Sequence, residues 1–517
     1  MPEARRITGP HLLLDQPGAI IELVGDTKEI VARLNLGLGR LGWPGIPVLR
    51  SHAGGTSLGI EAPPDLLYTA CALLEWAAGD TWDAVERERA NEENPRLRRL
   101  LEQATGAVFA DDDFGFTSGL GKHSRTWPLS NLPDPDTIER GLPIPLVFIT
   151  GTNGKTTTTR MLTRIAVAAG LTPGWTGSDA WGVGLDIEER GDWTGPGAAR
   201  KVLRHPRVDF AILETARGGL LRRGLVIGGA EVAVVTNVAS DHLGEWGVHD
   251  LADMARAKLG VALGLRTGGV LVVNTGCEPL REAVVELLVR RPDLRVVGFE
   301  DDGRDSFALD GGALQWSEVP MTYDGTARHN VENAMAAAVA AQSLGLPFAA
   351  IRNGLGSFKP TPAESFGRMN RFELPNGATV LVDFGHNPHG VTMVGDTTAR
   401  WPALRRCLLI GQAGDRTDQD VAELAAVIAR LRPDEVVIKG MTKYRRGRPE
   451  GQVEALLRQG LLSAGYPADQ IRLTPDEHTG VKSMLDAAQE GDLLILFVHE
   501  SPDDAYALLR ARGAAPT

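Results

Sequence analysis

The chain has 517 residues, of which 43% are hydrophobic, a length that usually exceeds one core, so we expect about three domains. Its formal net charge of −12 is spread along the sequence, which argues against a nucleic-acid partner. The 3 cysteines are far apart, and no stretch of about 18 apolar residues occurs, so we expect no disulfide framework, zinc ribbon or membrane span. These features predict a cytoplasmic protein.

Residues 1–140 are predicted to form a small α+β domain with a linker. The segment AIIELV (19–24) is typical of a strand, and residues 27–41 and 63–90 have the apolar spacing of helices. Residues 111–145 are rich in Asp, Gly, Ser and Pro, which interrupts both periodicities. We therefore expect a linker or an ordered loop there, and a domain boundary.

The rest of the chain is typical of two α/β domains, 141–362 and 363–517. Apolar runs alternate with helical segments, as in parallel sheets covered on both faces. The predicted strands are LVFIT, FAILET, VAVVTN and GVLVVN in the first domain and TVLVDF, CLLIG, EVVIK and DLLILFV in the second. Because ligands bind at the carboxyl ends of such strands, we expect the functional residues in the loops that follow them.

The loop after the first of these strands is predicted to bind a polyphosphate. Its sequence GTNGKTT (151–157) joins a strand to a helix, whose first N–H groups point at one position. Gly151 and Gly154 let the backbone approach phosphates, Lys155 can reach the terminal phosphate, and the Thr156 hydroxyl can ligate Mg²⁺. The Gly-x-x-Gly-Lys-Thr spacing is shorter than the common P-loop. A glycine-containing turn without a ligand is the alternative.

Two strand ends carry candidate metal ligands. Glu214 follows the segment FAIL, where its carboxylate can meet a cation held by Thr156. Asn237, Asp241 and His242 follow the next strand, and a hydroxyl, a carboxylate and an imidazole at one sheet edge make a metal shell. Solvation at a strand end explains each residue alone equally well.

Two further segments suit nucleotide recognition. Asn330 and Asn333, in RHNVENA, are spaced to lie on one helical face, where two amides can meet the edge of a base. Asp383, His386 and Asn387, in VDFGHNPHG, follow a strand and can accept ribose hydroxyls or position a phosphate. A polar helix start and an ordinary loop are the alternatives.

Taken in order, GTNGKTT, LETARGG, TNVASDHLG, RHNVENA and DFGHNPHG resemble the Mur ligase superfamily, over about residues 141–517. The segments WTGPGAARKVL, LETARGGLLRRGL and GRPEGQVEALLRQG are similar to the Mur-like part of cyanophycin synthetase. The resemblance implies a central P-loop ATPase domain and a Rossmann-like C-terminal domain that form an amide bond with ATP and Mg²⁺. In that family a carboxylate attacks the γ-phosphate to give an acyl phosphate, and an amine then displaces phosphate.

The resemblance implies catalytic roles for single residues. Lys155 would hold the β- and γ-phosphates, Thr156 and Glu214 would hold one Mg²⁺, and His242 would hold a second. Lys258 lies where several family members carry a carbamylated lysine that assists the second ion. An ordinary lysine of an amphipathic helix is the alternative for Lys258.

The resemblance also implies a nucleotide site. Asn330 and Asn333 would meet adenine, Asp383 would meet ribose, and Arg368 matches a nucleotide-contacting arginine. Phe366 replaces the proline that usually precedes the Gly-Arg pair, which puts the local turn in question. The implied ATP-binding set is Gly151, Thr152, Asn153, Gly154, Lys155, Thr156, Thr157, Asn330, Asn333, Arg368 and Asp383.

The acceptor carboxylate is expected near the loops TGSDAWGVG and WTGPGAAR. Ser178, Asp179 and Thr194 lie where the family receives that substrate. Arg217 and Arg222 offer positive charge to a carboxylate, although solvent-facing arginines are the alternative.

The C-terminal domain is expected to close over the site and bind the incoming amine. The candidates are Asp415, Arg416, Arg448 and Glu500, the last in FVHES, which is similar to a family segment that grips the amino acid. His386 is a further substrate candidate. Solvated loop charges are the alternative for each residue.

The N-terminal segment RRITGPHLLL weakly resembles the start of cyanophycin synthetase, yet no ATP-grasp domain follows it. The resemblance therefore implies the amine-adding activity alone, on small amino-acid or peptide substrates, without nucleic acid or membrane. Self-association is expected only by analogy. The alternatives are a folylpolyglutamate-type ligase and a nucleotide-binding regulator or partner of a separate ligase.

Overall fold

The structure, a computed structural model, describes residues 5–7, 18–23, 27–41, 47–52, 55–62, 70, 71, 73, 74, 77, 144–225, 227–240, 243 and 248–517. The described residues form two compact units. The first unit comprises residues up to Gly151 together with 172–238 and 243–298, and the second comprises 152–171, 239–242 and 299–517. Most of the predicted linker, as well as Asp241 and His242, lies outside the described residues. The predicted domain boundaries at 140 and 362 stay predictions.

The N-terminal part is α+β, as predicted. Its antiparallel sheet has the order β1-β2-β4-β3, with bounds Arg5–Ile7, Gly18–Leu23, Gly55–Glu61 and Val48–His52, and it carries helix α1 (Lys28–Leu41). Ile21 and Leu58 from the sheet pack with Leu34 of α1. Of the predicted helix 63–90, the described residues are helical and buried.

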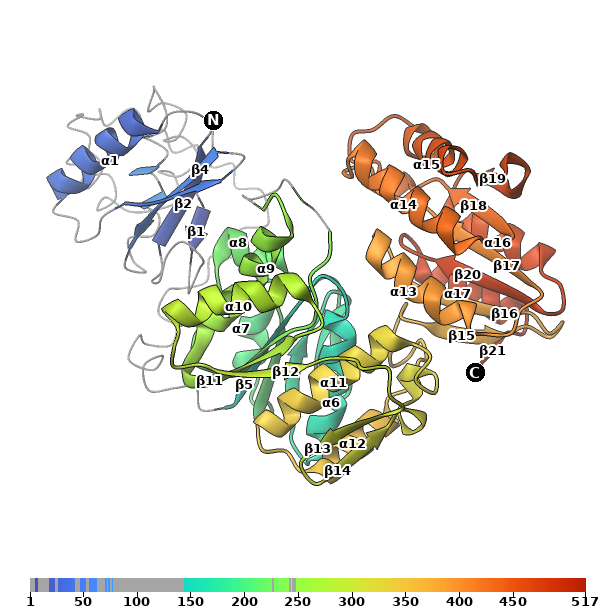
Figure 1. Ribbon diagram of the computed structural model, residues 1–517, viewed down its shortest axis with the longest axis horizontal. Coiled ribbons are helices and arrows are strands. Elements are labelled where there is room, and N and C mark those ends of the chain that lie inside the picture. Colours follow the sequence, from blue (N-terminus) through green and yellow to red (C-terminus); the bar gives the residue numbers. More distant parts are fainter. Residues whose placement is uncertain are drawn as a thin grey trace, which may run out of the picture. The chain divides into compact units, whose positions relative to one another are not determined.

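The eight-stranded sheet of the first unit has the order β12-β11-β10-β5-β9-β6-β7-β8. Figure 1 labels its strands β5, β11 and β12. These strands are Arg295–Phe299, Leu265–Asn274, Ala230–Val235, Leu146–Thr150, Phe210–Glu214, Pro173–Thr176, Ala180–Val183 and Asp186–Arg190. The strands from β11 to β6 are parallel, whereas β7 and β8 extend the sheet in antiparallel fashion. Its helices are α7 (Pro196–Leu203), α8 (Arg217–Arg223), α9 (Leu251–Leu259) and α10 (Glu278–Arg290), with the 3-10 helix η4 (Gly260–Gly264).

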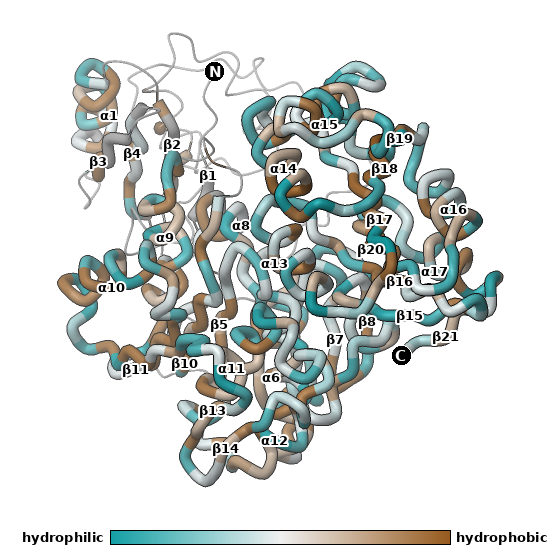
Figure 2. Tube along the Cα trace, turned by 45° about the vertical axis from the view of Figure 1, so that its right-hand side comes forward, coloured by the Kyte–Doolittle hydropathy of each residue, from teal (hydrophilic) through white to brown (hydrophobic). Residues whose placement is uncertain are grey.

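Continuous apolar runs mark the central strands because both of their faces are buried. Every residue of β5 and β9 is buried, and Figure 2 shows β5, β10 and β11 in brown. The four strands predicted in this part of the chain are therefore confirmed.

A three-helix layer in the second unit consists of α6 (Lys155–Ala168), α11 (Arg328–Ser343) and α12 (Phe348–Ser357). The backbone of α6 approaches α12 closely at Gly354, where a Cβ would overlap the backbone of Ile165. The hairpin β13 (Ser306–Leu309) and β14 (Gly312–Gln315) precedes this layer, together with the 3-10 helices η5 (Trp316–Glu318) and η6 (Pro320–Thr322).

The C-terminal sheet is doubly wound, with the order β19-β18-β17-β20-β16-β15-β21. Its strands are Ile471–Thr474, Glu435–Lys439, Arg405–Ile410, Asp492–Phe497, Thr379–Asp383, Asn370–Glu373 and Ala515–Pro516. Its helices are α13 (Pro388–Ala399), α14 (Asp418–Leu431), α15 (Gln452–Ser463), α16 (Glu477–Ala487) and α17 (Pro502–Ala511), with the 3-10 helices η7 (Thr442–Tyr444) and η8 (Ala468–Gln470).

Alternate residues of β20 show the two layers of this sheet. Leu493 and Ile495 pack in one core with α13, α14 and α15, whereas Leu494 and Leu496 pack in a second core with α16 and α17 (Figure 1). The predicted Rossmann-like domain is confirmed. The carboxyl ends of β16, β17, β18 and β20 lie at one sheet edge, because these strands are parallel neighbours.

The cysteines differ in burial. Cys71 and Cys407 are buried, Cys277 is half-buried, and all three are free thiols. Burial raises the pKa of Cys407 to about 12. Among the described helices, none is long and apolar enough to cross a membrane.

Candidate functional site

The loop after β5 has the predicted form. Gly154 is the residue before α6, has a φ of 82°, and the helix start has no side-chain cap. The Lys155 ammonium donates to the backbone oxygen of Thr152 at 3.0 Å, and Thr156 and Thr157 are buried in the first turn. The partial positive charge of this turn and the Lys155 ammonium suit a polyphosphate, whose binding at this loop stays a prediction.

Helix α11 holds this loop through Asn333. A Cβ on Gly154 would overlap the Asn333 amide, so only glycine leaves room for it. The Asn333 oxygen accepts from the Thr158 hydroxyl at 3.4 Å, and its amide group donates to the Asn330 oxygen at 3.1 Å. Asn330 in turn donates to the Met321 oxygen at 2.9 Å. The two asparagines share a helical face as predicted, but both amides bond within the protein here, and their contact with adenine stays a prediction.

The loop also meets the helix start of α13. The amides of Asn153 and Asn387 donate to each other at 3.3 and 3.2 Å, and the Asn153 amide donates to Nδ1 of His389 at 2.9 Å. The Asn387 oxygen caps α13 by accepting from the Gly390 N–H at 2.8 Å. The segment GHNPHG is therefore joined to the phosphate-loop segment in the second unit.

Two histidines near this loop are neutral at neutral pH. Burial lowers the pKa of His329 to about 4, and burial also lowers the pKa of His389. Because Nδ1 of His389 accepts from Asn153, its single proton is on Nε2.

Asp383 is enclosed at the end of β16. Its carboxylate accepts from the N–H groups of Met369 at 2.8 Å and Gly385 at 2.7 Å. Burial raises the pKa of Asp383, opposed by the nearby charge of Arg368 and by these N–H groups. The Arg368 guanidinium lies over the Phe384 ring at 4.9 Å. A ribose contact of Asp383 and a nucleotide contact of Arg368 stay predictions.

The turn before Arg368 is formed without the usual proline. Phe366 packs against the Tyr506 ring at 5.2 Å, and the Gly367 N–H donates to the Tyr506 hydroxyl at 2.9 Å. Gly367 has a φ of 66°. The turn therefore forms with Phe366 in place of the proline, because Tyr506 contacts both Phe366 and Gly367.

The predicted amine residues occupy three loops at the same sheet edge. Arg448 donates to the oxygens of Gly414 at 2.9 Å and Arg416 at 2.5 Å, so it holds the loop that carries Asp415. One oxygen of Glu500 accepts from the Lys443 N–H. Substrate contacts of these residues stay predictions, as does that of His386, whose backbone oxygen accepts from Gln412 at 3.2 Å.

In the first unit, two predicted carboxylates flank one glycine. A Cβ on Gly177 would lie 3.0 Å from an Asp179 oxygen and 3.4 Å from a Glu214 oxygen. Thr194 and Glu214 both line a cavity of about 20 Å³, which has room for roughly one water molecule. The structure therefore groups an expected metal ligand with two expected acceptor residues.

The remaining predicted residues have simple placements. Ser178 is exposed, Arg217 is half-buried at the start of α8, and Lys258 is buried in α9. The side chain of Arg222 and the whole of His242 lie outside the described residues. Within the described residues, no three His, Cys, Asp or Glu side chains are grouped as a metal site.

Two protein-family models match most of the C-terminal two thirds of the chain. The family model of the Mur ligase middle domain matches residues 149–341, and that of the Mur ligase glutamate ligase domain matches residues 367–497. The chain belongs to the Mur ligase superfamily. Members of this superfamily are ATP-dependent ligases, and the predicted resemblance is confirmed.

Named relatives in the superfamily include two cyanophycin synthetases. That of Crocosphaera subtropica is 34% identical over 418 residues, covering 77% of this chain and 47% of the relative. That of Synechocystis sp. is 36% identical over 389 residues, covering 71% and 44%. The UDP-N-acetylmuramate–L-alanine ligase of Variovorax paradoxus is 27% identical over 382 residues, covering 68% and 70%. The Mur-like chain thus spans less than half the length of these cyanophycin synthetases.

Solved structures have the same fold. E. coli FolC in complex with DHPP and ADP gives a TM-score of 0.55 at 23% identity, covering 73% of this chain and 92% of FolC. MurF from Acinetobacter baumannii gives a TM-score of 0.54 at 19% identity, covering 72% and 78%. The Mur ligase fold predicted for this chain is confirmed.

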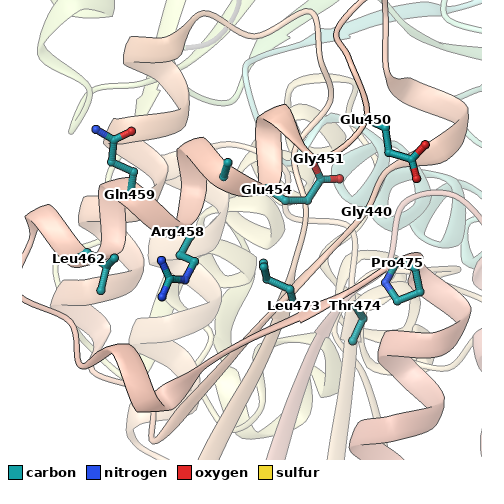
Figure 3. Close-up of a pocket in the computed structure, with 11 residues that line it drawn as sticks. Gly440, Glu450, Gly451, Glu454, Arg458, Gln459, Leu462, Leu473, Thr474 and Pro475 are labelled. Atoms are coloured by element: carbon teal, nitrogen blue, oxygen red, sulfur yellow. The ribbon is translucent and has the colours of Figure 1, made fainter.

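A cavity of about 510 Å³ in the C-terminal domain contains none of the predicted Mur ligase site residues (Figure 3). Figure 3 shows Arg458 of α15 and Leu473 of β19 on its two sides, with Glu454 near Gly440. Since it lies at the outer strands of the sheet, away from the ends of β16 and β20, we assign it no role in the ligase site.

Sequence reasoning missed several residues that shape the site of this Mur ligase. His389 lies in the segment GHNPHG, but a histidine in the first turn of a helix has no distinguishing sequence pattern. Lys439 and Glu477, described below, are also absent from the predicted set. The signal that could have indicated Lys439 is a lysine directly after three apolar residues at the end of a strand, in EVVIK.

Proposed function

We propose that this chain is an ATP- and Mg²⁺-dependent carboxylate–amine ligase that adds an amino acid to the carboxylate of an amino acid or short peptide. The observation that carries the proposal is the phosphate loop, in which Gly154 and Lys155 begin an uncapped helix beside Asn333. The relatives named as ligases support amide-bond formation. A fold neighbour solved with Mn, AMPPNP and L-glutamate supports a nucleotide and a divalent cation.

The phosphate loop supplies what phosphoryl transfer requires. Such transfers need positioning and neutralisation of charge more than a covalent nucleophile. In our proposal Lys155 and the first N–H groups of α6 hold the β- and γ-phosphates. The acceptor carboxylate attacks the γ-phosphorus, so an acyl phosphate forms and ADP leaves. The amine then attacks the acyl carbon and expels phosphate.

The chemistry of two side chains fits Mg²⁺, which prefers oxygen ligands. Thr156 offers a hydroxyl and Glu214 a carboxylate, and both residues are buried. We propose each as a ligand. When bound, Mg²⁺ would neutralise phosphate charge that develops during transfer.

The amine is proposed to bind at the loops after β17, β18 and β20. Asp415 and Glu500 place negative charge there, which favours an amino acid with a basic side chain. Arg217, at the start of α8, is proposed to attract the acceptor carboxylate.

The test is phosphate release from ATP and Mg²⁺ with amino acids, Asp- or Glu-containing peptides and a folate, offered singly and in pairs. Lys155→Ala should abolish release, because it removes the charge proposed to hold the terminal phosphate. Lys482→Ala is the matched control, since Lys482 is an exposed lysine paired with Asp486 on α16.

Release that needs both a carboxylate and an amine, and that only Lys155→Ala abolishes, would establish the ligase. Release that requires a folate carboxylate would instead indicate a folylpolyglutamate-type enzyme. Binding of ATP with no release under any pair would contradict the proposal and favour a nucleotide-binding regulator.

A further inference from the structure

A buried ion pair lies at the end of β18, beside the loop that follows β20. Lys439, the last residue of β18, is 1% exposed, and Glu477, the first residue of α16, is 3% exposed. The Lys439 ammonium donates to a Glu477 oxygen and to the backbone oxygen of Phe497 at 2.6 Å. Removing two charges from water is costly, so such a pair persists only when further hydrogen bonds satisfy it.

Glu477 has those further bonds, and all of them come from one loop. Its carboxylate accepts from the consecutive N–H groups of His499 at 2.6 Å, Glu500 at 3.0 Å and Ser501 at 2.7 Å. Three successive N–H groups that surround an anion form the kind of nest that binds phosphate elsewhere. Here the anion is a side chain of the protein itself.

Glu477 is not needed as a helix cap. Asp476 caps α16 by accepting from the Thr479 N–H at 2.7 Å. The Glu477 carboxylate is therefore left for residues 498–501, which we name the amine loop. Burial raises the pKa of Glu477, but the Lys439 charge and the loop N–H groups hold it below its usual value. Glu477 is thus ionised at neutral pH.

The amine loop is tied on two other sides. The Lys443 ammonium donates to the Glu500 backbone oxygen at 3.0 Å and to the Ser501 hydroxyl at 2.9 Å. The His499 ring lies 3.0 Å from the Gly385 oxygen through Nε2, and burial lowers its pKa well below the usual value, so the neutral ring donates. Gly385 donates to Asp383, so the amine loop is linked to the end of β16.

We propose that Glu477, paired with Lys439, is a positioning residue that fixes the amine loop and thereby the Glu500 carboxylate for the incoming amine. This inference rests on the proposed function. One Glu500 oxygen is engaged by the Lys443 N–H, and the other has no hydrogen-bond or ion-pair partner among the described residues. That second oxygen is the one available to an ammonium group of the substrate.

The first measurement is amide hydrogen exchange of residues 499–501 in Glu477→Gln. A glutamine cannot accept all three N–H groups and presents its own N–H₂ to Lys439, so exchange there should rise by about tenfold or more. Asp492→Asn is the matched control, because it breaks a pair with Arg405 of 2.6 Å at the opposite end of β20. The control should leave exchange at 499–501 unchanged.

A second variant separates positioning from stability. Replacing a buried pair with apolar residues of similar size is often neutral for stability, so Lys439→Met with Glu477→Leu should fold even if the single variant does not. This double variant still lacks an acceptor for the loop N–H groups. It should show the same fast exchange at 499–501 with a normal melting temperature.

The second measurement is the KM of the amine in phosphate release, using the amino acid that gives the fastest release with the unmodified protein. Both Glu477 variants should raise this KM by about tenfold or more, because a displaced binding group of this kind costs up to about 100-fold. The KM of ATP should stay within about twofold.

The outcomes separate the two proposals. Unchanged exchange at 499–501 in both Glu477 variants would overturn the positioning role. Faster exchange with an unchanged KM of the amine would overturn the link to amine binding. Absence of amine-dependent release in the unmodified protein would overturn the proposed function alone, since the exchange result stands without it.

Discussion

Replacing Gly154 with alanine tests the phosphate loop through a single added carbon. The φ of 82° at this position costs an L-residue about 1–2 kcal/mol. The new Cβ would also overlap the Asn333 amide. Asn333 must then rotate, and it loses its hydrogen bonds with Thr158 and Asn330.

The expected loss in the free energy of unfolding follows from the backbone strain and the lost hydrogen bonds. Each hydrogen bond contributes about 0.5–1.5 kcal/mol, so strain and two lost bonds together lower the free energy of unfolding by about 2–5 kcal/mol. If the loop moves instead of Asn333, the same free energy appears as nucleotide affinity, weakened by about 30-fold or more.

Gly170→Ala is a matched control at the other end of α6. Gly170 has a φ of 85°, but nothing lies within 4 Å of its added Cβ. It should therefore show only the strain of about 1–2 kcal/mol and retain nucleotide affinity. Urea unfolding and binding of a fluorescent ATP analogue measure both quantities.

Asn333→Ala in the Gly154→Ala background completes the test. Because the Cβ then has space, Gly154→Ala should cost less nucleotide affinity when added to Asn333→Ala than when added to the unmodified protein. The reasoning would be refuted if Gly154→Ala and Gly170→Ala lost the same stability and both bound the nucleotide normally.

Two further predictions concern the second unit. A histidine of the unfolded chain has a pKa near 6.5, whereas burial lowers the pKa of His329 to about 4. Between these two pH values only the unfolded state takes up the proton, so the free energy of unfolding falls as the pH drops from 6.5 to 4. His329→Gln should flatten this part of the pH profile in urea titrations, and an unchanged slope would contradict the assignment. Tyr506→Phe removes the hydroxyl that bonds Gly367 and Asn370 and should cost about 1–3 kcal/mol, measured by thermal unfolding. The hydroxyl of Tyr444 has no hydrogen bond among the described residues, so Tyr444→Phe should leave the stability nearly unchanged. Equal losses of stability in the two variants would contradict the role of the Tyr506 hydroxyl.

The strands of the fold were predictable because both faces of a central parallel strand are buried, so each reads as a continuous apolar run. All eight predicted strands of the two α/β sheets are present within a few residues. The antiparallel extension β8 was not predictable, because each of its residues, Asp186–Arg190, is exposed and its sequence DIEER lacks a period of two.

The site was predictable where its residues are adjacent in sequence. The phosphate loop is one local segment, and its Gly, Lys and Thr follow from the chemistry of phosphate binding. The bonds of Asn153 to Asn387 join residues 234 positions apart, and those of Glu477 reach residues 22 to 38 positions away. No local pattern encodes such pairings, because they depend on which strand ends the topology brings together.

The burial of the cysteines decides how this protein can be studied by fluorescence. Maleimide dyes react with accessible thiolates, and Cys407, with a pKa of about 12 and a buried thiol, offers almost none. Cys71 is equally enclosed, so Cys277 is the remaining site of background labelling. A Cys277→Ser chain would thus accept a dye pair at one new cysteine in each compact unit, such as exposed Val289 and Leu404, and report their separation as nucleotide is added.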